Sequence, residues 1–538
     1  MNKLLLLAGL FLTSNISAQM NSFVELNENS LQCTVNSNGE LFSNLANSGP
    51  GFSVEFSQSL YTIFSNRIVL AGLGPNGDLA MTKPHGSNNL ANGPLTVAPG
   101  YEFGPATITP AESNAWSQIF VVTQDEIDEF KNYHACMADP NCDATINFPN
   151  YQIPSSISNW PAHGDITIDQ SFFLAPFYDA DWDGNYNPEA GDYPCIKGDI
   201  YAWFVMNNYL TDPSVTTTTK GLEIHVEVYQ FEGQTGGDAL SNTVFVGYDV
   251  INRGTTPLSD FYLSNYTDFD LGYPLDDYMG TLPDINAYFI YNGDDYDETS
   301  SFGQGFLDHL PVQGVVSLNH DLSAAGYADV DVYTPVEYYN IMRGYHTDGS
   351  VKYFPGTQIA TAFTFPYSTN TPYQWTEANS DGNGMVNTPG DRRMQGAVGP
   401  LFLDVGESIS YDFAFVYAKE EVAGLGNEAS ISKLITDINT VQDYYDNQMT
   451  DCSGGFLTVE VMDEVAVNIY PNPTTELLFI ETSDKKVFDY KLCDASGRVV
   501  ISGQGKQQAQ LDMSQLMPGV YYLTMMGEGK GVYKVVKQ

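Results

Sequence analysis

Hydrophobic and polar residues alternate over Leu222–Tyr229, where every second residue from Leu222 to Val228 is apolar. A period of two predicts a β-strand with one face in the core. Similar hydrophobic runs predict companion strands at Thr243–Ile251, Asp260–Tyr266, Ala287–Tyr291 and Ile409–Ala418. Ser22 to about Tyr101 adds short apolar runs between turns rich in Gly and Asn. The pattern predicts the all-β fold class with a large β-rich body.

Two segments have helical spacing instead. Thr123-Gln124-Asp125-Glu126 is a capping-box pattern followed by Ile127, Phe130 and Tyr133, which predicts a short helix over about 124–135. Apolar residues on one face predict a second helix over about 428–447: Ile431, Leu434, Ile435, Ile438, Val441 and Tyr445.

The two ends of the chain differ from the body. Lys3, the apolar run Leu4–Leu12 and the small residues before Gln19 predict a signal peptide over 1–18. Residues 451–464 are predicted as a linker after a body over 19–450, which is one domain or two lobes divided near residue 220. Residues 465–538 alternate short apolar runs with turn residues, which predicts a small immunoglobulin-like β-sandwich.

Charge is concentrated in the body. The chain holds 21 Lys and Arg against 66 Asp and Glu, and residues 465–538 take 8 of the former and 7 of the latter. Without these and Lys3, residues 19–464, which are the body and the linker, carry 12 basic and 59 acidic residues. Nucleic-acid binding is excluded as a function class, since phosphate contacts need Lys and Arg. No segment is apolar enough to predict a membrane span.

The acidic loop Asp179–Asp192 is the sharpest local signal. Calcium takes six to eight oxygen ligands in irregular geometry. Carboxylates at alternate positions followed by a glycine let a short loop wrap one such cation. The loop departs from an EF-hand because Ala190 stands at the twelfth position, so Glu189 or Asp192 would have to complete the shell. The predicted calcium ligands are Asp179, Asp181, Asp183, Asn185, Asn187, Glu189 and Asp192.

A second calcium site is predicted after a strand, from Asp268, Asp270, Asp276 and Asp277. The run Asn379–Gly384, with Asp391 downstream, is a weaker third candidate. Asp294, Asp295 and Asp297 are expected to form only a polar turn. For each cluster the alternative is a solvated acidic turn.

The sequence contains few motifs that indicate catalysis. No Gly-x-Ser-x-Gly, His-Glu-x-x-His or phosphate-binding glycine motif is present. His163 is expected to be a structural histidine bonded to a loop carbonyl. Paired carboxylates for glycoside hydrolysis remain an alternative, as does a sugar-binding face built from the 35 tyrosines. Among six cysteines, Cys136 and Cys142 are the best candidate disulfide pair, and Cys493 is expected to be a buried thiol.

Motifs in the last 74 residues resemble a known family. They are Tyr470-Pro471-Asn472-Pro473, Ser496-Gly497-Arg498, Pro518-Gly519-Val520-Tyr521 and the lysine-containing end Tyr533–Lys537. The segment resembles the type A C-terminal sorting domain of Bacteroidota type IX secretion substrates. The resemblance implies that 465–538 binds the type IX secretion machinery and that the protein is extracellular or on the outer-membrane surface.

The body also resembles secreted Bacteroidota proteins with the same sorting domain and no assigned activity. Motifs that carry this resemblance are Trp160–Asp165, Asp268–Gly272 and Val398–Leu401. The resemblance implies a shared β-rich body but transfers no function. We therefore expect an exported calcium-binding protein that acts as a binding or structural module, with a glycan or surface partner. The alternative is a carbohydrate-active enzyme.

Overall fold

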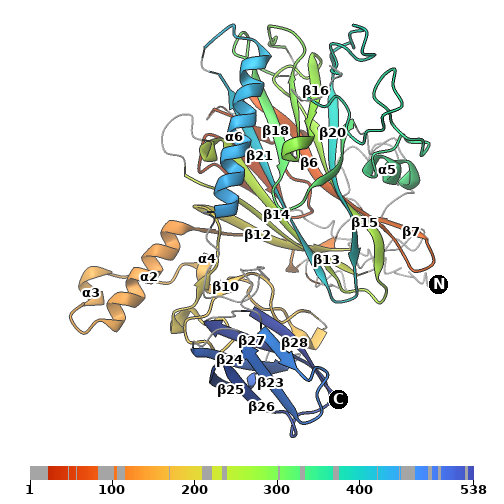
Figure 1. Ribbon diagram of the computed structural model, residues 1–538. Helices are drawn as coiled ribbons and strands as arrows, with labels where there is room; N and C mark the ends of the chain where they lie inside the picture. The colour runs from red at the N-terminus through yellow and green to blue at the C-terminus, as the bar shows by residue number, and fades with distance from the viewer. Residues whose placement is uncertain are drawn as a thin grey trace, which may run out of the picture.

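The structure is a computed structural model that contains one β-rich body and a small C-terminal β-domain (Figure 1). It describes residues 22–82, 102–105, 115–208, 221–232, 239–300, 303–327, 334–367, 375–449, 467–482, 487–494, 499–527 and 531–538, apart from residues 47, 56, 58, 104, 169, 421 and 448. The predicted signal peptide over 1–18 and linker over 451–464 lie outside the described residues.

Eight strands of the described chain form one antiparallel sheet of the body. In spatial order they are β1 (Phe23–Leu26), β2 (Gln32–Asn36), β5 (Phe52–Ser53), β6 (Tyr61–Leu73), β15 (Leu258–Phe269), β20 (Arg392–Leu403) and β19 (Leu322–Tyr327), with β7 (Leu79–Thr82) paired to β6.

Nine strands of the described chain form the second antiparallel sheet. Their order is β16 (Asp277–Leu282), β17 (Ala287–Asn292), β18 (Pro311–Ser317), β21 (Ser408–Lys419), β14 (Thr243–Asn252), β13 (Leu222–Gln230), β12 (Ile200–Asn207) and β8 (Glu102–Phe103), with β9 (Phe120–Thr123) paired to β12. Two short pairs are separate: β3 (Ser43–Asn44) with β4 (Gly49–Pro50), and β10 (Phe177–Tyr178) with β11 (Tyr193–Pro194).

The main core lies between the two large sheets. Ile224, Val226 and Val228 of β13 enter it, as the alternation predicts, and meet apolar residues of β6 and β15. The five predicted strands are therefore confirmed as β13, β14, β15, β17 and β21. Both sheets combine strands from before and after residue 220. The body is thus a two-layer β-structure, in agreement with the predicted fold class.

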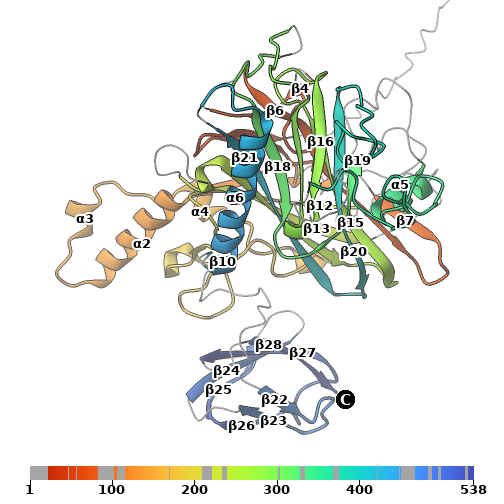
Figure 2. The ribbon, with the colours of Figure 1, turned by 45° about the horizontal axis from the view of Figure 1, so that its top comes forward.

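The helices lie outside the two large sheets (Figure 1). The two predicted helices are confirmed as α2 (Gln124–Ala138), which has the expected capping box at Thr123, and α6 (Asn427–Asn447). Helix α6 packs on β18 and β21, where Gly314 permits close approach: an added Cβ there would lie 2.8 Å from Leu434 Cδ1. The remaining α-helices of the described chain are α3 (Ala144–Asn147), α4 (Ser155–Ser158) and α5 (Pro335–Met342). Figure 2 shows α2 and α3 extending away from the sheets.

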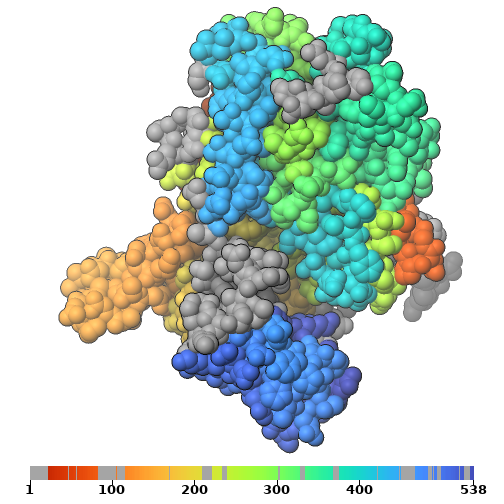
Figure 3. Space-filling model, viewed as in Figure 1, coloured from red at the N-terminus to blue at the C-terminus, as the bar shows by residue number. Residues whose placement is uncertain are grey.

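The C-terminal domain is a seven-stranded antiparallel sheet in the described residues, folded into two layers around its own core (Figure 2). Its strands are β22 (Val467–Tyr470), β23 (Leu477–Thr482), β26 (Gln508–Asp512), β25 (Val499–Lys506), β24 (Val487–Asp494), β27 (Gly519–Gly527) and β28 (Gly531–Lys537). In Figure 3 it forms a distinct blue lobe below the body.

Asn472 of the Tyr-Pro-Asn-Pro motif connects the two ends of this domain. Its Nδ2 donates to the Lys534 carbonyl at 2.6 Å, and its Oδ1 accepts from the Val536 N–H at 2.8 Å. The opening motif and the lysine-containing strand β28 are therefore parts of one hydrogen-bonded unit.

Candidate metal sites

The acidic loop is closed at its base by the β10–β11 pair. Tyr178 pairs with Tyr193, so Asp179 leaves β10 at the point where Asp192 enters β11. Both carboxylates have no exposed surface. The two-strand stem thus brings the first and last predicted ligands of the loop to its buried side.

Asp192 and Asp179 shape the loop by accepting backbone hydrogen bonds. Asp192 accepts from the N–H groups of Ala180 and Asn187 at 2.8 and 2.7 Å. Asp179 accepts from the N–H groups of Asp183 and Gly184 at 3.2 and 2.8 Å. Gly184 has a φ of +82°, in the left-handed region that suits glycine. The glycine after the third aspartate therefore makes the turn that the sequence indicated.

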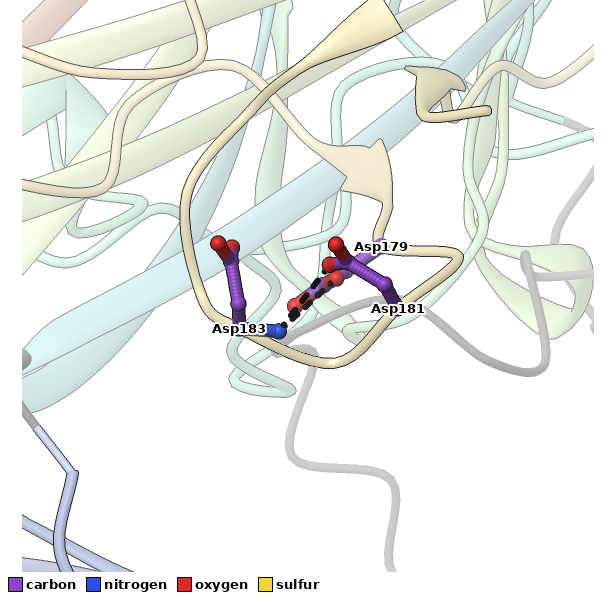
Figure 4. Close-up of side chains that lie close together, drawn as sticks. All are labelled: Asp179, Asp181 and Asp183. Atoms are coloured by element: carbon purple, nitrogen blue, oxygen red, sulfur yellow. Dashed lines mark hydrogen bonds between the residues drawn. The ribbon is translucent and has the colours of Figure 1, made fainter. Parts of the chain in front are cut away.

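Three carboxylates gather inside the loop. Asp179, Asp181 and Asp183 each present an oxygen within 4.8 Å of the others (Figure 4). Asp179 is buried, whereas Asp181 and Asp183 are exposed. Three carboxylate oxygens around one point, two of them open to water, are a suitable partial shell for a hard cation that keeps some water ligands.

The other two predicted carboxylate ligands of the loop, Glu189 and Asp192, lie outside this group of three. Asn187 Oδ1 accepts the N–H of Glu189 at 3.2 Å and so caps a short 3-10 turn, and Glu189 is exposed. The Asn185 N–H donates to Asp183 Oδ1 at 2.7 Å. The structure thus brings together three of the five predicted carboxylate ligands and gives Asp192 and Asn187 positions that shape the loop.

His163 holds the loop against the body, as expected for a structural histidine. Its Nε2 accepts the N–H of Tyr186 at 2.8 Å, so the proton is on Nδ1, which donates to the Phe172 carbonyl at 3.0 Å. Burial lowers the pKa of His163, which favours this neutral form. Burial also raises the pKa values of Asp179 and Asp192, so the loop has two carboxyls whose charge lacks full solvation.

The second predicted cluster is larger than the sequence indicated. Asp268 and Asp270 meet Asp391, each with an oxygen within 4.8 Å of the others. Asp391 had been grouped with Asn379–Gly384, and that grouping was wrong. Residues 379–384 form a partly exposed turn in which Asp381 Oδ1 accepts from the N–H groups of Asn383 and Met385.

Asp276 and Asp277 lie on the buried side of the same region. Asp277 is fully buried, and burial together with the charge of Asp276 raises its pKa well above the usual range. Burial and the charge of Asp297 raise the pKa of Asp276 to about 8. Asp297 was expected in a polar turn, which was wrong: it is 1% exposed, and burial raises its pKa to about 6.

Other predictions concern the rest of the chain. The disulfide between Cys136 and Cys142 is confirmed, Cys195 is also disulfide-bonded, and Cys493 is buried in β24. Many tyrosines fill the core and so do not form a sugar-binding face, among them Tyr201, Tyr229, Tyr248, Tyr266, Tyr288, Tyr338 and Tyr411. In the described part of the chain, no helix has the length and apolar character needed to cross a membrane.

Comparisons with known proteins identify one part of the chain. The comparison with curated proteins finds no match. Solved structures that match include a polysaccharide lyase, 13% identical over 59% of this chain, with a TM-score of 0.18. The chain spans about a third of that protein, 34% of its length, and at this TM-score the likeness carries no argument.

The family of secretion system C-terminal sorting domains matches residues 468–538. The match covers β22 to β28, including the motif around Asn472 and the terminal strand. Such a domain supports interaction with the type IX secretion machinery. Residues 468–538 are a secretion system C-terminal sorting domain, and the chain is exported to the cell surface or the extracellular space.

Proposed function

We propose that the exported body is a calcium-binding protein that acts as a binding or structural module outside the cell. The observation that carries the proposal is the convergence of Asp179, Asp181 and Asp183 within one loop. Each of them has a distinct part: Asp179 shapes the loop from its buried side, while Asp181 and Asp183 are open to solvent and to an arriving ion. Water and backbone carbonyls would complete the shell.

The alternative function, that of a carbohydrate-active enzyme, has less support from the described residues. Glu227 and Asp412 flank Gly247 on neighbouring strands and are the type of carboxylate pair that such an enzyme would need. However, Glu227 is bonded to Lys197 and Tyr201, and Asp412 accepts from Tyr445. These partners make the pair part of the packing beneath α6.

Thermal unfolding of the full exported chain, with calcium and then with chelator, tests the proposal. An ion that binds only the folded state adds about 2.7 kcal/mol of stability at about 100 times its dissociation constant. We expect calcium to raise the melting temperature and the Asp181→Asn/Asp183→Asn double variant to show a smaller rise. Asparagine keeps the shape of each side chain but removes the charge.

Asp381→Asn is the matched control. Asp381 makes the same local turn as Asp183, with an oxygen accepting the N–H two residues later, but it lies in a partly exposed turn outside the groups of converging carboxylates found in the described chain. Its calcium response should equal that of the wild type. Equal calcium responses in the wild type and the double variant would refute the loop as a calcium site.

A further inference from the structure

A second group of carboxylates lies where the chain crosses from one large sheet to the other. Strand β15 of the eight-stranded sheet ends at Phe269, and β16 of the nine-stranded sheet begins at Asp277. Asp270 and Asp276 lie on the connection between them. Asp297 is drawn in from the loop after β17 because its two oxygens accept the N–H groups of Tyr273 and Phe306 at 2.9 and 2.7 Å. We call Asp270, Asp276, Asp277 and Asp297 the buried acidic centre.

The side chain of Asp277 gives this centre a second, independent feature. It has no exposed surface, and its Oδ2 accepts the Leu271 N–H at 3.3 Å. Its Oδ1 has no hydrogen-bond partner among the described residues. An ionised Oδ1 would need a donor, and a protonated Oδ1 would need an acceptor. Neither protonation state satisfies this atom, whereas a cation would.

The cations that the protein supplies here are already engaged with other carboxylates. Arg393 contacts Asp268 at 3.2 Å and Asp391 at 3.0 Å, on the outer side of Asp270. Arg392 makes two bonds of 2.9 Å to Glu377. Buried carboxylates are costly unless they are paired or coordinate a metal. Arg393 therefore supplies one positive charge beside six carboxylates: Asp268, Asp391 and the four members of the centre.

We propose that the buried acidic centre binds a divalent cation of the calcium class through Asp270 and Asp277, and that this ion joins the two sheets of the body. Asp270 follows a strand of one sheet and Asp277 begins a strand of the other, so an ion held by both fixes the crossing. Asp276 and Asp297 add negative charge around it, and Asp268 with Asp391 lies at its outer end. This site is separate from the loop Asp179–Asp192 and does not depend on it.

The test uses the full exported chain with the Asp181→Asn/Asp183→Asn double variant as background. After removal of bound metal, calcium alone is titrated into the protein by calorimetry, and melting temperatures are measured in parallel. We expect the background to keep a calcium-binding event and a calcium-dependent rise in melting temperature. Adding Asp277→Asn should weaken that binding by at least about tenfold, a loss typical of altered metal sites.

Two further variants make the outcome decisive. Asp437→Asn in the same background removes a nearly buried carboxylate that has its own partner, Lys433 at 2.7 Å, so calcium binding should be unchanged. If Asp277→Asn does not fold, Asp391→Asn at the more exposed outer end decides, and it should weaken binding. A background protein that binds no calcium, or unchanged affinity after Asp277→Asn, would overturn the proposal. If the loop does not bind calcium, the wild type and the double-variant background should instead give the same calcium titration and the same rise in melting temperature.

Discussion

The two acidic regions of the body are assembled in opposite ways. The loop Asp179–Asp192 draws its converging carboxylates from five consecutive residues, and two of these carboxylates are exposed. The buried acidic centre draws on both large sheets and on the loop after β17, and Asp277 and Asp297 are almost completely buried. The loop shapes itself through its own backbone N–H groups, whereas the centre is complete only when Asp297, from the loop after β17, packs against the connection between the sheets.

This difference sets what each region does to stability. An ion in the loop orders only the segment between β10 and β11. Loss of that order leaves the two large sheets intact. Without an ion, the centre places like charges in a medium where their repulsion is poorly screened. We therefore expect the loop to behave as a local calcium site and the centre to control the stability of the whole body.

Replacement of one glycine by alanine in each region should give the largest difference in stability between the two regions. An added Cβ at Gly272 would lie 2.0 Å from Asp297 Oδ2, and its φ is +67°. Gly191 in the loop is equally left-handed, with a φ of +107°, but its added Cβ would meet Ala180 at an ordinary 3.4 Å. Gly272→Ala should cost about 2–5 kcal/mol from strain and displacement of Asp297, and Gly191→Ala about 1–2 kcal/mol.

Denaturant unfolding of both glycine variants in chelator measures these costs. Calcium titration then shows whether Gly272→Ala also weakens the site in the double-variant background, as displacement of Asp297 requires. Equal costs at the two positions would mean that the contact of Gly272 with Asp297 is unimportant and that only backbone strain matters.

Features set by neighbouring residues could be predicted from the sequence, whereas contacts between segments distant in the sequence could not. Alternation identified β13, β14 and β21, and the loop aspartates were visible from their spacing alone. Asp297 was misjudged because its sequence neighbours, Asp294 and Asp295, have the composition of an exposed turn. Its burial depends on hydrogen bonds to Tyr273 and Phe306, which no local pattern encodes. Helix α5 was also missed, although Thr334 and Glu337 form a capping box that was readable in the sequence.

The pH dependence of stability in the metal-free protein should also differ between the two acidic regions. We expect a difference of at least about 1 kcal/mol in the free energy of unfolding, which corresponds to one pKa unit. The pKa of Asp276 is raised from 3.8 to about 8 by burial and by the neighbouring Asp297 and Glu298. A folded-state pKa above the unfolded value means that the native state binds the proton more tightly. Stability in chelator should therefore rise as the pH falls from about 8 to 6.5.

That pH window excludes one of the opposing groups, His163. His163 has a lowered pKa, so its contribution is fully present above its unfolded value of 6.5 and is lost only below it. Urea unfolding at several pH values checks the prediction. Asp276→Asn should make the profile less steep, whereas the Asp181→Asn/Asp183→Asn variant should keep it. Calcium should also flatten it, because an ion at the centre displaces protons. A flat profile for the metal-free wild type would contradict the buried charge of the centre.

The smallest effect on stability belongs to Trp182, yet it distinguishes the two sites spectroscopically. Trp182 lies between Asp181 and Asp183 and is 37% exposed, so Trp182→Phe should change stability by no more than about 0.5 kcal/mol. Terbium, a hard cation that accepts oxygen ligands, emits when a nearby indole transfers energy to it. Trp182→Phe should therefore remove tryptophan-excited emission from the loop while leaving calcium affinity unchanged. Tyrosine-excited emission should persist, because Tyr178 directly precedes Asp179 in the loop and Tyr278 directly follows Asp277 in the buried acidic centre. Persistence of the tryptophan-excited emission in Trp182→Phe would place the ion away from Trp182.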